Sequence, residues 1–127
     1  MILLRIDRFL YRHWMIITIG LLLIITVLSL YPIPVLPEMG GNDKIRHFIA
    51  YGVLTFPVSY VNFKKTFPLL LVFVCFSGCI ELIQPLVNRN GEWLDLLANA
   101  AGIVIGFLVG KGILTLKKSF FLYKNSQ

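Results

Sequence analysis

Four long stretches with few charged residues constrain the fold of this chain more than any other feature. A helix needs about 20 mostly apolar residues to cross the hydrocarbon core of a bilayer, which is about 30 Å thick. The sequence predicts such helices over residues of about 14–30, 43–61, 67–84 and 93–116. We therefore expect one all-α domain over residues 1–127, a polytopic membrane protein whose four transmembrane helices form a compact bundle.

The composition excludes an ordinary soluble domain. Only 14% of the residues are charged and 57% are hydrophobic, with a mean hydropathy of +0.82, whereas about a quarter of the residues are charged in a typical soluble domain. Too few polar side chains exist to cover the surface of a globule, so lipid must cover much of it.

The first predicted span also has the layout of a signal peptide, because Arg5, Arg8 and Arg12 precede its apolar stretch. We favour a helix that is retained. Its apolar stretch is long for a signal peptide, and its removal would leave three short helices to bury their own polar faces.

The basic residues predict the orientation in the membrane. If the four spans alternate, one side receives Arg5, Arg8, Arg12, Lys64, Lys65, Lys117, Lys118 and Lys124. The other side receives Lys44, Arg46 and Arg89. The positive-inside rule then places both termini in the cytoplasm. The net charge of +6 comes largely from these flanking residues, which share no face with stacking aromatics, so no nucleic-acid partner is expected.

Strongly polar side chains on the predicted spans gather at the opposite, extracytoplasmic end. Such side chains are costly in hydrocarbon and usually face the bundle interior or a wet cavity. Three pairs, each with a spacing that shares one helical face, are Asp43 and His47, Glu81 and Gln84, and Asp95 and Asn99. Tyr51 continues the first pair, and Arg89 lies between the third and fourth spans. We expect one polar pocket built by three helices.

Several of these residues also have plainer explanations. Asp43 and Asp95 could simply cap helix N-termini, where a carboxylate meets free amides and the positive end of the dipole. Glu81 lies near a helix C-terminus, which disfavours negative charge, so it needs Arg89, His47, a proton, a cation or a ligand as partner. A lone histidine is usually a packing residue, but the carboxylates around His47 favour a site role.

Small residues in the third and fourth spans predict packing features. Gly102, Gly106 and Gly110 recur every four residues, a spacing that lets two transmembrane helices approach closely. We expect this face to pack inside the bundle, with a homo-oligomer through the same glycines as the alternative. Cys75 and Cys79 are expected to be small buried residues rather than a redox or metal pair.

The polar pairs and their neighbours resemble the VanZ-like family of small bacterial membrane proteins. The elements that match are Asp43-Lys44-x-x-His47-x-x-x-Tyr51-x-x-Leu54, Glu81-x-x-Gln84, Arg89 and Asp95-x-x-x-Asn99-x-x-Gly102. The family takes its name from an accessory protein of glycopeptide resistance that lowers susceptibility to teicoplanin. The resemblance implies a cell-envelope role in the bacterial cytoplasmic membrane. It marks as functional residues Asp43, His47, Glu81, Gln84, Arg89, Asp95 and Asn99.

The leading functional hypothesis is a binding protein whose outward-facing pocket holds the head group of a membrane lipid or lipid-linked envelope precursor. Arg89 and Lys44 would hold phosphate, with the planar fork of the arginine giving two hydrogen bonds. Gln84, Asn99 and Tyr51 would contact the rest of the head group. An effect on glycopeptide or lipoglycopeptide susceptibility would then follow from altered surface lipids.

Two other classes of function remain open. A hydrolase or transferase acting on a lipid-linked substrate would use His47 as general base oriented by Asp43, Glu81 or Asp95 as a second acid or base, and Arg89 to stabilise charge. No metal or cofactor is expected, because the chain lacks a double-histidine motif. A scaffold or assembly factor would instead use the polar residues as an interhelical hydrogen-bond network.

Overall fold

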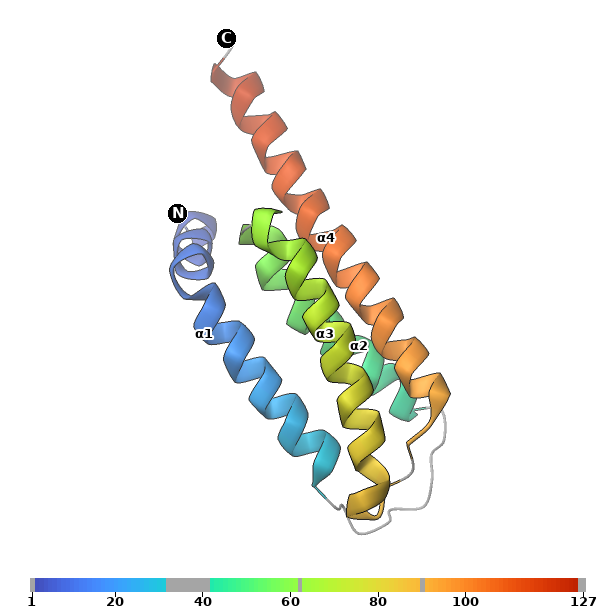
Figure 1. The fold of residues 1–127 in the computed structure, drawn as a ribbon. Coiled ribbons are helices and arrows are strands. Elements are labelled where there is room, and N and C mark those ends of the chain that lie inside the picture. Colours follow the sequence, from blue (N-terminus) through green and yellow to red (C-terminus); the bar gives the residue numbers. More distant parts are fainter. Residues whose placement is uncertain (1, 32–41, 62, 90, 126–127) are drawn as a thin grey trace.

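The computed structural model describes residues 2–31, 42–61, 63–89 and 91–125. They form an all-α bundle (Figure 1) that consists of α1 (Ile2–Leu30), α2 (Asn42–Val61), α3 (Phe63–Ile83), a short 3-10 helix η1 (Gln84–Val87) and α4 (Trp93–Asn125). Within these residues, three segments are long and apolar enough to cross a membrane: Arg5–Leu30, Lys64–Val87 and Trp93–Tyr123. The chain is therefore a polytopic membrane protein with a helical bundle.

Two helices extend beyond the predicted spans at their charged ends. α1 begins at Ile2 rather than near residue 14, and α4 continues to Asn125 rather than ending near residue 116. Hydropathy locates the part of a helix that suits hydrocarbon, whereas the ends of a helix depend on backbone hydrogen bonding and caps. Arginine and lysine are good helix formers, so the helices continue through the basic flanks. The sequence also predicts a turn after the first span, at Pro32, Pro34 and Pro37, but these residues lie outside the described part of the chain.

The end of α3 shows how one proline positions a loop. α3 ends at Ile83, and Pro85 lies in the first turn of η1. η1 closes at Asn88, which adopts the left-handed conformation with φ of 59°. The backbone N–H of Arg89 then donates to the carbonyl oxygen of Gln84 at 3.0 Å. This tight turn fixes where the chain leaves α3 and brings Arg89 to the end of α1.

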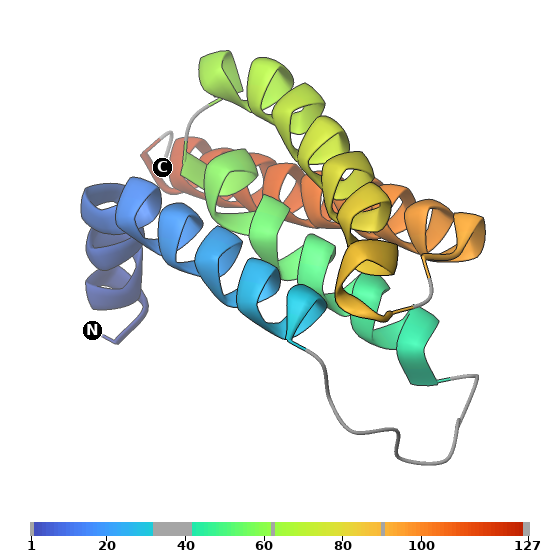
Figure 2. The same ribbon diagram turned by 60° about the horizontal axis from the view of Figure 1, so that its bottom comes forward.

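α2 lies in the middle of the bundle and contacts α1, α3 and α4 (Figure 2). Its residues Leu54 and Val58 are fully buried in the apolar core. Its buried hydroxyl groups are satisfied internally, since Thr55 and Ser59 donate to carbonyl oxygens one turn earlier at 2.8 and 2.9 Å. Because most of its side chains are buried or half-buried against other helices, α2 can be less apolar than the three helices around it.

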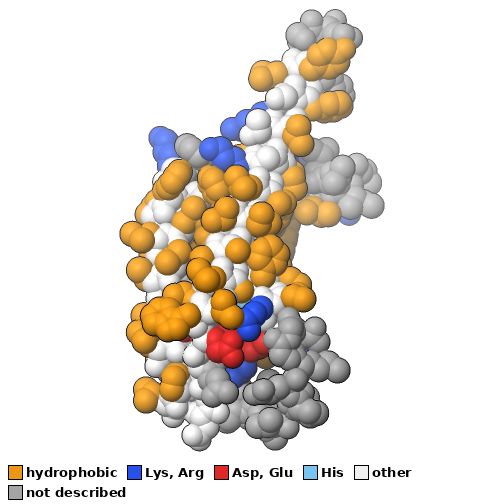
Figure 3. All heavy atoms as spheres, turned by 90° about the vertical axis from the view of Figure 1, so that its right-hand side faces the viewer, with side chains coloured by type: hydrophobic (Ala, Val, Ile, Leu, Met, Phe, Trp, Pro, Cys, Tyr) orange, Lys and Arg blue, Asp and Glu red, His pale blue; other side chains and the backbone are white. Residues whose placement is uncertain are grey.

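Apolar side chains cover the outside of the bundle. On the face in Figure 3 they spread over most of the length of the helices, while acidic side chains gather beside basic ones near the lower end. Large side chains such as Ile16, Leu71 and Leu97 are each more than 60% exposed. Soluble monomers rarely expose apolar surface this continuously, so lipid is the natural cover.

The glycine ladder of α4 packs directly against α2. A Cβ atom at Gly102 would overlap with the carbonyl oxygen of Phe48, and one at Gly106 would overlap with the carbonyl oxygen of Gly52. At Gly110 a Cβ atom would lie 2.9 Å from a side-chain carbon on α2. The glycine face is thus occupied within the chain, and an oligomer would need another face.

The two cysteines differ from expectation. Cys75 and Cys79 are both free and exposed, so the prediction that they are buried was wrong. The buried face of α3 is narrow and runs through Phe73, Ser77 and Ile80. The spacing of the cysteines put them on one face of the helix, but it could not tell which face meets the other helices.

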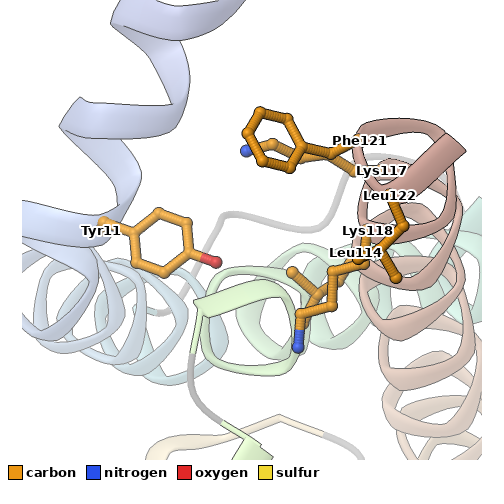
Figure 4. A pocket seen from close by; sticks show the side chains of 6 residues that line it. All are labelled: Tyr11, Leu114, Lys117, Lys118, Phe121 and Leu122. Carbon is orange, nitrogen blue, oxygen red and sulfur yellow. The ribbon is translucent and has the colours of Figure 1, made fainter. Parts of the chain in front are cut away.

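The end of the bundle that carries both termini has a polar cluster of its own. Lys117 of α4 forms an ion pair with Asp7 of α1, and the hydroxyl of Tyr60 donates to the same carboxylate. The Lys117 ammonium lies 5.9 and 5.8 Å from the ring centres of Tyr11 and Tyr60, within reach of cation–π attraction. A cavity of about 340 Å³ beside it (Figure 4) is lined by Tyr11, Leu114, Lys117, Lys118, Phe121 and Leu122.

The helix packing predicts that replacing glycine by alanine has different effects on stability at two positions of α4. Gly106→Ala should destabilise the bundle by about 1–3 kcal/mol, because the new methyl group forces two backbones apart. Gly112→Ala is the matched control, since nothing lies within 4 Å of a Cβ there, and it should be neutral or stabilising by up to about 1 kcal/mol. Thermal unfolding in detergent measures both, and equal effects would contradict the close contact.

Candidate functional site

The predicted polar pairs lie together at the end of the bundle opposite both termini, at the bottom of Figure 1. Asp43 and His47 belong to the first turns of α2, and Asp95 and Asn99 belong to the first turns of α4. Glu81 lies in the last turn of α3. Because α2 and α3 run in opposite directions, as do α3 and α4, the N-terminal ends of α2 and α4 lie beside the C-terminal end of α3.

Asn99 is the central residue of this cluster and is completely buried. Its Nδ2 donates to Ser77 Oγ at 2.8 Å and to Glu81 Oε1 at 3.4 Å. Its Oδ1 lies 3.1 Å from His47 Nδ1. The two hydrogens of Nδ2 are thus directed to Ser77 and Glu81, which leaves Oδ1 facing the imidazole. One asparagine therefore joins α2, α3 and α4.

The orientation of Asn99 determines the tautomer of His47. Since Oδ1 of Asn99 accepts, Nδ1 of His47 carries a hydrogen and donates it. In a neutral ring, Nε2 then presents a lone pair. The polar atom that Nε2 faces is Oδ2 of Asp95 at 3.8 Å, which is too far for a hydrogen bond. The ring nitrogen is thus held beside carboxylates without being bonded to one.

Four buried polar atoms of the site form no hydrogen bond within the described part of the chain. They are Tyr51 Oη, Glu81 Oε2, Gln84 Oε1 and Asp95 Oδ1. A buried polar atom without a partner costs about 1–3 kcal/mol, so most native structures satisfy nearly all of them. A purely structural network would be expected to close on itself. This cluster instead keeps hydrogen-bonding capacity for solvent, an ion or a ligand.

A cavity of about 320 Å³ lies beside His47, between the end of α1 and the start of α2. Its α1 wall is mostly apolar and its α2 wall is mostly polar. It is lined by Ile25, Leu28, Ser29, Asp43, Arg46, His47, Ala50, Tyr51 and Arg89. Asp95 and Asn99 lie near His47 without lining the cavity, and Glu81 is linked to His47 through Asn99.

Arg89 caps the end of α1. One of its guanidinium nitrogens, Nη1, donates to the carbonyl oxygens of Leu28 at 2.8 Å and Ser29 at 3.2 Å. A cation is favourable there, because the last carbonyls of a helix lack intrahelical partners and carry the negative end of the dipole. Gln84 adds a weaker contact of 3.4 Å to the same Ser29 carbonyl. Arg89 was one of the partners suggested for Glu81, but among the described residues the two side chains form no ion pair.

The second cation of the cavity is Arg46 rather than the expected Lys44. Lys44 forms an exposed ion pair of 3.0 Å with Glu92 and does not line the cavity. The helical period explains the difference, because residues 43, 46, 47 and 50 share the face that looks into the cavity. Ser77 was also missed, although it lies four residues before Glu81 and therefore on the same face of α3.

Comparisons with known proteins give one family. The model of the VanZ/LLP1 family matches residues 5–116, which include every residue of the cluster and of the cavity. No curated protein and no solved structure matches the chain.

The cluster predicts that Asn99→Asp destabilises the bundle by about 1–3 kcal/mol, because an acceptor replaces the donor that faces Glu81. Adding Glu81→Gln should restore most of the loss, since the new amide can donate to the new carboxylate. Chemical or thermal unfolding of the four proteins in detergent gives the double-mutant cycle.

Asn88→Asp is the matched control for this cycle. Asn88 is exposed at the same end of the bundle, so the same change of charge should alter the free energy of unfolding by less than about 0.5 kcal/mol. Additive effects of Asn99→Asp and Glu81→Gln would contradict the hydrogen bond between the two side chains.

Proposed function

The chain belongs to the VanZ/LLP1 family, and on this basis we propose that it is a protein of the bacterial cytoplasmic membrane that binds the head group of a lipid or lipid-linked envelope precursor. The observation that carries the proposal is the cavity beside His47, which combines two arginines with an apolar wall in a protein otherwise covered by apolar side chains. A phosphate-bearing amphiphile has the matching parts.

The two arginines supply the phosphate donors. Among the described residues, the side chain of Arg46 forms no hydrogen bond or ion pair, and it lines the cavity. Arg89 uses Nη1 for the end of α1, so its other nitrogens can serve a ligand. A guanidinium group can hold a phosphate through two parallel hydrogen bonds. The α1 side chains Ile25 and Leu28 would then lie along the first part of an acyl or prenyl chain.

The remaining polar groups suit hydroxyls of a head group. Asp43 and Tyr51 line the same cavity as the arginines. A carboxylate accepts hydrogen bonds from sugar or glycerol hydroxyls and repels a bare phosphate at that position. Asp43 therefore favours a head group in which the phosphate lies toward the two guanidinium groups and hydroxyl groups lie toward Asp43 and Tyr51.

We place the cavity on the extracytoplasmic side. The end that carries both termini contains Arg5, Arg8 and Arg12 on α1, Lys64 and Lys65 on α3, and Lys117 and Lys118 on α4. The positive-inside rule assigns that end to the cytoplasm. α2 crosses as a fourth span despite its lower hydropathy, because α1, α3 and α4 shield it. Ligand binding outside the cell would affect glycopeptide or lipoglycopeptide susceptibility through surface lipids.

The same site argues against a purely structural role. A scaffold has no need for a cavity beside His47, nor for buried polar atoms that lack partners such as Gln84 Oε1. A binding pocket uses both, since the cavity admits a ligand and the spare atoms can bond to it.

The orientation predicts a labelling pattern in intact cells. In a background with Cys75→Ser and Cys79→Ser, a membrane-impermeant thiol reagent added outside should label Glu92→Cys, which replaces an exposed residue at the cavity end of the bundle. It should not label Lys64→Cys or Tyr123→Cys until the membrane is opened. The opposite pattern would place the cavity in the cytoplasm and remove the envelope-ligand proposal.

The cavity predicts a distinct effect of Arg46 on ligand binding. Titration of the purified protein with a short-chain phosphatidic acid and with a polyprenyl phosphate should give saturable binding. Arg46→Ala should weaken it by about 1.5–3 kcal/mol, the range for hydrogen bonds to a charged group. Arg46→Lys should be intermediate, because it keeps the charge but loses the planar fork.

Lys118→Ala is the control for general attraction of anionic lipids, since this exposed cation lies at the other end of the bundle. Arg46 makes no contact that supports the fold in the described structure, so unfolding temperatures should stay unchanged in all three variants. Equal losses for Arg46→Ala and Lys118→Ala would contradict a specific phosphate site.

A further inference from the structure

Three potential metal ligands converge where α2 meets α4. Asp43 and His47 lie one turn apart on α2, and Asp95 lies in the first turn of α4. One ligand atom from each, a carboxylate oxygen, an imidazole nitrogen and a second carboxylate oxygen, lie within 4.8 Å of one another. Imidazole and carboxylate groups together suit Zn²⁺ and Mn²⁺.

The three ligand atoms lie farther apart than in a formed site. Two ligands about 2.1 Å from a tetrahedral ion are about 3.4 Å apart, so a separation of 4.8 Å would have to shorten by about 1.4 Å. His47 Nε2 and Asp95 Oδ2 are 3.8 Å apart, which is too far for a hydrogen bond and near that ligand spacing. Metal binding would therefore require side-chain rotation of the carboxylates.

A second, independent observation is that Asp95 is buried and one of its carboxylate oxygens has no hydrogen-bond partner in the described part of the chain. Its side chain is only 2% exposed, and its Oδ1 forms no hydrogen bond within the described residues. A buried carboxylate without a hydrogen-bond partner or close counter-ion is strongly disfavoured. Capping does not account for Oδ1, because a cap would donate a backbone N–H to it. Asp95 therefore needs a compensating proton or cation, and the imidazole Nε2 of His47 lies 3.8 Å from its Oδ2.

The hydrogen bonding around His47 matches that of a metal ligand. Metal-binding histidines almost always donate their second ring N–H to a fixed acceptor, which orients the ring and selects the tautomer. Here Nδ1 donates to Asn99 Oδ1 at 3.1 Å, and Asn99 is itself held by Ser77 and Glu81. The lone pair of Nε2 is thereby directed to the side where the two carboxylates lie.

The basic side chains nearby do not supply the missing charge. Lys44 is paired with Glu92, and Arg89 donates to the carbonyls of α1. Arg46 lines the same cavity, but among the described residues it forms no ion pair with Asp43 or Asp95. A divalent ion would balance the negative charges of Asp43 and Asp95 together.

We propose that Asp43, His47 and Asp95 bind a divalent transition-metal ion, Zn²⁺ or Mn²⁺. Asp43 and His47 line the cavity, so three protein ligands leave a coordination position that opens to it. The sequence did not predict this site, because the ligands come from two helices and include a single histidine. The inference does not rest on the proposed lipid function, since the ion is held by protein side chains alone.

The test is metal titration of the purified full chain in detergent, after chelator treatment, with Cys75→Ser and Cys79→Ser in every protein to exclude thiol sites. ZnCl₂ and MnCl₂ are the probes, followed by calorimetry and by the unfolding temperature. We expect one equivalent to bind and to raise the unfolding temperature. Asp43→Asn and Asp95→Asn should each weaken binding by about tenfold or more.

Glu92→Gln and His13→Gln are the matched controls. The first removes one carboxylate from the same end of the bundle without removing a ligand, and the second removes the other histidine. Both should bind as the parent does. Asp43 forms no hydrogen bond in the described structure, so Asp43→Asn keeps the test decisive if Asp95→Asn fails to fold.

Two results would overturn the metal site. One is a parent protein that binds neither ion saturably. The other is binding that Asp43→Asn leaves unchanged, which would place the ion elsewhere. Failure of lipid binding with intact metal binding would remove only the head-group proposal.

Discussion

The close approach of α2 and α4 is the contact on which the rest of the structure depends. Gly102 and Gly106 have no side chain where the α2 backbone passes, so the two helices touch along their main chains. In a membrane, apolar side chains gain little by leaving lipid, and close van der Waals packing becomes the main source of helix association. The same contact brings His47 of α2 within reach of Asp95 and Asn99 of α4.

Polar groups buried between these helices specify one arrangement rather than merely stabilising it. Asn99 can satisfy His47, Ser77 and Glu81 together only when α2, α3 and α4 adopt a single register. A slip of one residue would leave several of these groups without partners in a medium that has few to offer. The network therefore fixes the orientation of the His47 imidazole, which faces the cavity.

The cavity gathers three chemically different surfaces. Arg46 and Arg89 supply cationic donors, His47 and Asp43 supply candidate metal ligands, and the end of α1 supplies an apolar wall. A phosphate oxygen can bind both guanidinium groups and a divalent ion, so the two proposals describe compatible halves of one site. Arg89 contributes to both the cavity and the fold, because the same side chain lines the cavity and donates hydrogen bonds to the last carbonyls of α1.

The sequence by itself determined the helices and the end of the bundle where the polar residues lie. Hydropathy depends on composition along the chain, and the spacings of the Asp43, Glu81 and Asp95 pairs depend on the helical period, so both are local. Only the tertiary structure decided which face of each helix meets its neighbours: it turned Cys75 to the outside and put Arg46 instead of Lys44 at the cavity. The physical reason is that a residue's surroundings depend on helix rotation, which is set by packing between distant segments.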